Sequence, residues 1–189
     1  MLIIRGFETV TVMALASFVS AGCATQTAAF RHMSAEDHER VGAAGGDAAE
    51  PSDHLAAAEG LRRAERAACY EVPDAERDAG PFAHRDQIAG VEVVRERLYP
   101  KAPPQAIGVV VTLRATRGET EQWLGRVIEC HMAHRAVVGA RMAQQTCPLA
   151  VDDARVGLSS TPTGFRVAIT SKDLSVARSV IDSCRGLVD

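Results

Sequence analysis

Residues 129–149 (ECHMAHRAVVGARMAQQTCPL) gather side chains that could do chemistry. This segment holds two of the five cysteines, two of the six histidines and two of the five methionines of the chain. Thiolates and imidazoles are ligands that Zn²⁺ accepts in a tetrahedral site, and Cu⁺ also favours sulfur. The segment therefore raises the hypothesis of a zinc or copper site with four candidate ligands: Cys130, His131, His134 and Cys147.

The spacing of these residues suits a helix. Cys130 and His134 are four positions apart, and His131 and His134 are three apart, so either pair shares one side of a helix. Cys147 could complete the set, and Met142 could add a thioether for Cu⁺. The segment contains neither a CxxC nor an HxxxH spacing, so it matches no established metal signature.

A disulfide is the competing interpretation of the same cysteines, and it is the one we favour. A Cys130–Cys147 bond would close a loop of about 17 residues and stabilise the fold by roughly 3 kcal/mol on the chain-entropy model. His131 and His134 would then be histidines of the core or its edge, bonded to backbone groups. Unbonded thiols are the third alternative, and the residue types leave all three open.

Cys69 and Cys184 pose a similar choice. Cys69 ends a predicted N-terminal helix, and Cys184 lies on the apolar face of a predicted C-terminal helix. A Cys69–Cys184 bond would hold the first helix to the rest of the domain. Alternatively, Cys184 is a small buried apolar side chain. Four cysteines allow three pairings, so the connectivity stays open.

The start of the chain has the features of an export signal. Arg5 precedes an apolar run at 10–19 (VTVMALASFV), which is too short to span a membrane, and Ser20-Ala21-Gly22-Cys23 follows. This order resembles the lipobox of bacterial lipoprotein precursors, which implies lipidation of Cys23 and cleavage before it. A plain secretory peptide and a short N-terminal helix are the alternatives. Because Ala24 follows the cysteine, we expect an outer-membrane anchor facing the periplasm.

Composition bounds the function. The net charge is −3 and only 4% of the residues are aromatic, so nothing favours a nucleic-acid partner. An exported chain meets an oxidising compartment, which favours disulfides. The sequence contains no GxSxG, HExxH or glycine-rich phosphate loop, so we do not expect an enzyme.

The chain divides into four parts by composition. Residues 1–22 are the expected signal peptide, 23–53 a flexible tether rich in alanine and glycine, 54–87 a helix and linker, and 88–189 the folded domain. Within the tether, Ser34 and Asp37 stand at capping-box spacing, which is typical of the start of a short helix. We expect Ser52 or Asp53 to cap the helix over 54–69.

The folded domain alternates strand-like and helix-like segments. Four stretches alternate apolar and polar residues or are rich in β-branched ones, and two have helical periodicity. The predicted strands lie at 88–98, 107–114, around 156–158 and at 165–170, and the predicted helices at 120–139 and from a Ser171 cap to Gly186.

This order, β-β-α-β-β-α, predicts an α+β fold. The economical arrangement is a four-stranded antiparallel sheet with both helices on one face. On the helix over 120–139, Trp123, Leu124 and Val127 share a side with His131 and His134, so we expect both histidines to face the sheet. Cys130 should lie at the edge of that buried side.

Several segments resemble a family of uncharacterised lipoproteins from proteobacteria, myxobacteria among them. The resemblance lies in the lipobox-like start and in the segments MSAEDHER, AERDAGPFAHRDQIAGVEVV, VVVTLRA, VIECHMAHRAVVGA and TCPL. Relatives carry a Cys-His pair on the helix and a Cys-Pro-Leu after it, which correspond here to Cys130-His131 and Cys147-Pro148-Leu149. The resemblance implies a location in the envelope and this fold, and it implies no activity.

Together these patterns predict a lipid-anchored envelope protein. A disulfide-bonded α+β domain would serve as a non-enzymatic binding or structural module for an envelope partner that the sequence does not identify. The alternative is a periplasmic metal-binding protein that holds copper or zinc through the Cys/His cluster.

Overall fold

The computed structural model describes residues 32–45, 50–139 and 147–187. Three helices come first: α2 (Ala35–Ala44), α3 (Pro51–Ala68) and α4 (Asp74–Ala79). The domain that follows has the order β1 (Ile88–Glu96), β2 (Gln105–Arg114), α5 (Glu121–Val138), β3 (Arg155–Thr161), β4 (Gly164–Thr170) and α6 (Leu174–Arg185). The signal peptide, Cys23 and Met142 lie outside the described residues.

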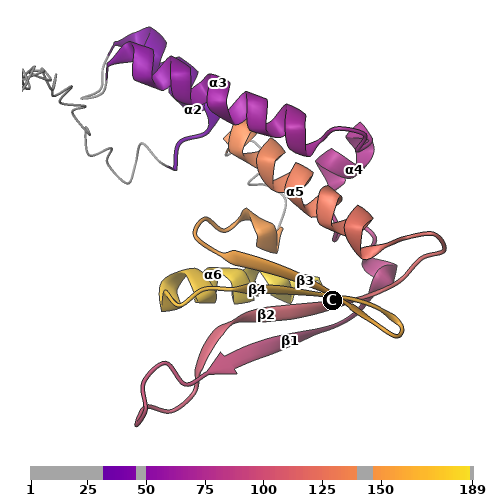
Figure 1. Cartoon of the computed structure of the whole chain (residues 1–189). Coiled ribbons are helices and arrows are strands. Elements are labelled where there is room, and N and C mark those ends of the chain that lie inside the picture. Colours follow the sequence, from indigo (N-terminus) through magenta and orange to yellow (C-terminus); the bar gives the residue numbers. More distant parts are fainter. Residues whose placement is uncertain (1–31, 46–49, 140–146, 188–189) are drawn as a thin grey trace, which may run out of the picture.

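The four strands form one antiparallel sheet in the order β1-β2-β4-β3 (Figure 1), which confirms the predicted α+β class. The two central strands are paired so that their apolar residues share a face. Val109 lies opposite Ile169, and Val111 lies opposite Val167. All four side chains are almost fully buried. The alternation seen in the sequence therefore marks the core face of the sheet.

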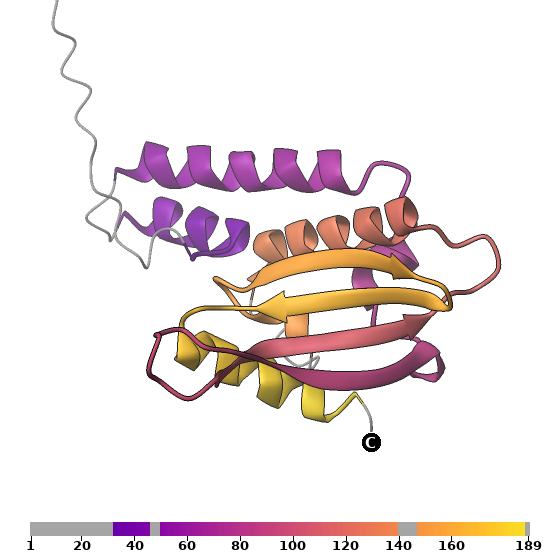
Figure 2. The ribbon, with the colours of Figure 1, turned by 60° about the horizontal axis from the view of Figure 1, so that its bottom comes forward.

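Both α5 and α6 cover this face. Leu124 and Ile128 of α5 and Val180 and Cys184 of α6 belong to the same core cluster as the strand residues. Figure 2 shows the opposite face of the sheet turned toward the viewer, with the two helices behind it. Since each helix buries one stripe against the sheet, the predicted two-layer arrangement is present.

The N-terminal helices form a further layer on α5 (Figure 1). The structure differs here from the expected tether, because α2 occupies residues 35–44 of it. Ser34 caps α2 by accepting a hydrogen bond from Asp37 N at 3.1 Å, and Ala35 is fully buried. His38 of α2 and His54 of α3 meet with their Nδ1 atoms 2.9 Å apart. The Ser34 cap and the packing of Ala35 and His38 therefore stabilise a helix in a segment whose composition is typical of a tether.

Helix boundaries differ in small ways from the expected ones. Glu50 rather than Ser52 or Asp53 precedes α3, and Pro51 occupies its first turn. Asp173 rather than Ser171 caps α6, accepting hydrogen bonds from the backbone nitrogens of Ser175 and Val176. The linker that follows α3 contains the short helix α4. These differences leave the strand and helix order unchanged.

Candidate functional site

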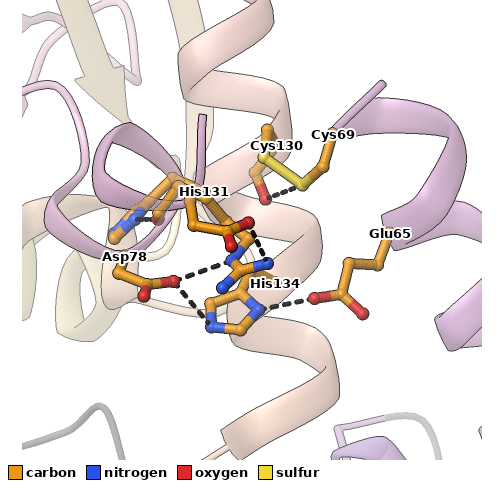
Figure 3. A network of polar contacts seen from close by, with 8 residues as sticks. Glu65, Cys69, Asp78, Cys130, His131 and His134 are labelled. Atoms are coloured by element: carbon orange, nitrogen blue, oxygen red, sulfur yellow. Dashed lines mark hydrogen bonds and ion pairs between the residues drawn. A yellow bond between two sulfur atoms is a disulfide. The ribbon is translucent and has the colours of Figure 1, made fainter. Parts of the chain in front are cut away.

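The Cys/His segment of α5 faces the N-terminal helices. Figure 3 shows Cys130, His131 and His134 on α5, opposite Cys69 and Glu65 of the α3 end and Asp78 of α4. The expectation that both histidines face the sheet is wrong. A helix covered on two sides has more than one apolar stripe, so periodicity alone does not tell which layer a side chain meets.

Cys130 forms a disulfide with Cys69, which is the residue that ends α3. The two cysteines are 61 positions apart in the sequence, and Cys130 is fully buried. The favoured Cys130–Cys147 pairing and the Cys69–Cys184 pairing are therefore both wrong. We expected a bond from Cys69 to hold α3 to the rest of the domain. The disulfide does so, but its partner lies on α5 instead of α6.

Glu65 and His134 repeat this contact one helical turn away. His134 Nδ1 lies 2.5 Å from Glu65 Oε1, and both side chains are largely buried. Glu65 stands four positions before Cys69, and His134 stands four positions after Cys130. In an antiparallel helix pair these offsets bring the two residues opposite each other. The disulfide and the Glu65–His134 pair are therefore consecutive contacts of one helix interface.

Asp78 reaches the other side of the same imidazole. His134 Nε2 lies 3.5 Å from Asp78 Oδ1, and Arg77 Nε lies 2.7 Å from that carboxylate oxygen. The Arg77 guanidinium and then the positive charge of nearby histidines keep the pKa of Asp78 below its usual range, against the effect of desolvation. His134 thus connects α3 and α4 to α5.

His131 is held by the end of α4. Its Nδ1 lies 2.8 Å from the backbone carbonyl oxygen of Arg77. Since a carbonyl oxygen only accepts, Nδ1 carries the hydrogen and donates it. Gly80 lies against the ring, where a Cβ would come within 2.8 Å of the imidazole, and its φ of +71° also favours glycine.

Burial lowers the pKa of His131, and the neighbouring Arg135 and His134 act in the same direction against the Arg77 carbonyl. The ring is therefore neutral at pH 7, with a lone pair on Nε2. That nitrogen lies 3.5 Å from Cys147 Sγ, so the thiol donates to it. Cys147 thus meets His131 instead of Cys130.

Cys184 is a buried thiol of the core. It is 1% exposed and packs among the apolar residues that α6 presses against the sheet. Burial raises its pKa to about 12, and Cys147 adds to the effect. This agrees with the interpretation of Cys184 as a small apolar residue.

The metal hypothesis fails on the same contacts. The Cys130 sulfur is bonded to Cys69, His134 faces two carboxylates, and His131 and Cys147 face each other. In the part of the chain that the structure describes, no group of three or more His, Cys, Asp or Glu side chains could hold a metal ion. The contacts of the described residues therefore do not support the zinc or copper alternative, and Met142 lies outside those residues.

Sequence reasoning found the side chains on α5 and missed their partners. Glu65, Asp78 and the Arg77 carbonyl had no motif of their own. The spacing of these residues could have identified Glu65. Glu65 stands one turn before Cys69, and His134 stands one turn after Cys130, so pairing the two cysteines in an antiparallel helix pair brings Glu65 to His134.

No protein-family model, curated protein or solved structure matches the chain. Among the described residues, no helix is both long enough and apolar enough to cross a bilayer.

Replacing Cys69 by serine should lower the free energy of unfolding by about 4 kcal/mol, because the bond closes a long loop in the unfolded chain. Cys69 is the better choice because it is partly exposed, whereas Cys130 is fully buried. Thermal melting with and without reductant measures the effect. The wild type should lose stability in reductant and the variant should not, and equal melting of both without reductant would contradict the disulfide.

Replacing His131 by asparagine should flatten the pH dependence of stability. Asparagine keeps a donor for the Arg77 carbonyl but does not titrate. Since the folded-state pKa of His131 is lowered, its contribution is complete above the unfolded value of about 6.5 and is lost as the pH falls below it. Melting temperatures between pH 8 and 5 check this, with His84→Asn as the control at an exposed loop histidine. Parallel curves for wild type and His131→Asn would contradict the assignment.

Proposed function

We propose that the protein is a lipid-anchored component of the bacterial cell envelope, attached through Cys23. Its disulfide-bonded α+β domain acts as a non-catalytic binding or structural module. The observation that carries the proposal is the Cys69–Cys130 bond. Structural disulfides persist in exported proteins and are rare in reducing compartments.

The sequence before the domain supports the anchor. The apolar run at 10–19 and the small residues before Cys23 have the order of a lipoprotein signal. Ser34 begins the described fold as the cap of α2. The stretch between Cys23 and Ser34 could extend at most roughly 40 Å, so the domain would stay close to the membrane surface.

The contacts of the cysteine and histidine side chains on α5 favour a binding role over a catalytic one. Cys130, His134 and Glu65 are engaged with each other or with their neighbours between helices, away from solvent. Chemistry on a substrate would need such groups to converge on an accessible point. In this protein they join helices instead.

The open face of the sheet is the surface we propose for a partner. Across its middle run Glu92, Val110, Ala168 and Gly157, one from each strand. Val110, Ala168 and Gly157 have small side chains or none, and Arg166 Nη2 lies 3.5 Å from Glu92 Oε2. A sheet face with small side chains and an ion pair suits a protein surface better than a small molecule, which prefers a concave site.

Changing Cys23 to serine should release the protein from membranes, because the acyl chains that hold it would be absent. The measurement is fractionation of cells that express the wild type or Cys23→Ser, together with acyl labelling of both. Cys184→Ser serves as the control, since it removes a cysteine without touching the signal. Labelled wild type in membranes and unlabelled variant outside them is the expected result.

Continued membrane attachment of the Cys23→Ser protein would contradict the anchor. Isolation of the wild type with Cys69 and Cys130 as thiols would contradict the exported location.

A further inference from the structure

Cys147 and Cys184 occupy the same part of the core. Cys147 begins the 3₁₀ turn Pro148–Ala150, and Cys184 lies near the end of α6, which packs on that turn. Cys147 packs against the apolar cluster that contains Cys184. The pKa of Cys184 is raised chiefly by burial and further by Cys147. Neither takes part in the Cys69–Cys130 disulfide.

The two thiols differ in access. Cys147 is partly exposed, whereas Cys184 is 1% exposed. A reagent from solvent can therefore meet Cys147 directly, and burial keeps Cys184 protonated. An external oxidant would have to react at Cys147 first.

His131 is oriented to serve Cys147 as a base. The Arg77 carbonyl fixes the hydrogen on Nδ1, so the lone pair of Nε2 points at the Cys147 thiol 3.5 Å away. An activated nucleophile consists of a thiol, an imidazole base and a group that fixes the tautomer of the imidazole. Because the ring is neutral at pH 7, the lone pair of Nε2 is available to accept a proton.

We propose that Cys147 and Cys184 form a redox-active dithiol in which Cys147 attacks a disulfide oxidant, with His131 as its base, and Cys184 resolves the product. The oxidant belongs to the class of disulfides, and glutathione disulfide is the example used below. Of the three ways to pair Cys69, Cys130, Cys147 and Cys184, this is the pairing that remains once Cys69 is joined to Cys130.

The reaction has two exchange steps. Cys147 gives its proton to His131 Nε2 as its sulfur bonds to one sulfur of the oxidant, and the oxidant's disulfide breaks. The departing glutathione thiolate takes that proton. Cys184 then attacks the Cys147 sulfur, its own proton passing to the second glutathione thiolate. The chain is oxidised by two electrons to a Cys147–Cys184 disulfide, and the oxidant is reduced to two thiols.

Peptide mapping of the full-length chain tests the pairing. The protein is incubated with glutathione disulfide at pH 7, quenched with acid, denatured, alkylated and digested without reductant. We expect a peptide that joins Cys147 to Cys184, present on isolation or formed during incubation. Alkylation of both thiols after prolonged incubation, or a bond from either cysteine to Cys69 or Cys130, would overturn the proposal.

Single variants test the order of attack. Cys184→Ser should accumulate a glutathione adduct at Cys147, because the resolving thiol is absent. Cys147→Ser should leave Cys184 as a thiol while the protein is folded. A glutathione adduct on Cys184 in folded Cys147→Ser would overturn the assignment of Cys147 as the attacking residue.

The role of His131 is tested in the Cys184→Ser background. His131→Asn should slow formation of the adduct by about tenfold or more, as loss of a general base does. In His131→Asn, the rate of adduct formation should then rise about tenfold per pH unit below the pKa of the Cys147 thiol, because only the thiolate reacts. His134→Asn is the matched control, since His134 contacts Glu65 and Asp78 instead of Cys147. Equal rates and pH profiles for His131→Asn and the parent would overturn the role of His131.

Discussion

The antiparallel contact between α3 and α5 is the constraint on which the arrangement of the N-terminal half depends. Cys69 bonds to Cys130, and one turn further along both helices Glu65 meets His134. The next turn brings Leu61 and Val138 against one small apolar cluster. A covalent bond, a largely buried ion pair and an apolar contact therefore follow each other along one interface and fix its register.

This interface matters because the N-terminal layer has little apolar surface of its own. Within α3 only His54 and Ala58 are buried, and α2 contributes Ala35 and His38. Two alanines and two histidines bury little apolar area with which to offset the entropy of ordering two helices. The sheet and its two helices, by contrast, share a continuous core of branched side chains. The disulfide and the histidine contacts thus join a weakly packed layer to a well-packed one.

The sequence predicted the sheet because its signals are local. Alternation over Val109, Val111, Val167 and Ile169 identifies the core face, and Thr120 marks the start of α5. The disulfide was not predicted, because pairing depends on which layer Cys130 faces. We expected α5 to have a single apolar side, which placed it against the sheet alone. The alanine- and glycine-rich composition of residues 23–53 predicted a tether, although Ser34 caps a helix there. Only the matched four-residue spacings on α3 and α5 carried that information.

Hydrogen exchange of the Cys69→Ala/Cys130→Ala variant against the wild type tests the central claim most directly. If the disulfide fixes the N-terminal layer on α5, amides of α2 and α3 should lose more protection in the variant than those of β2 and β4, because the layer would then also open locally. Unchanged protection in α3 would contradict the account. Equal loss of protection in the helices and the sheet would contradict it too, because the disulfide would then act only through global unfolding and not on the N-terminal layer itself.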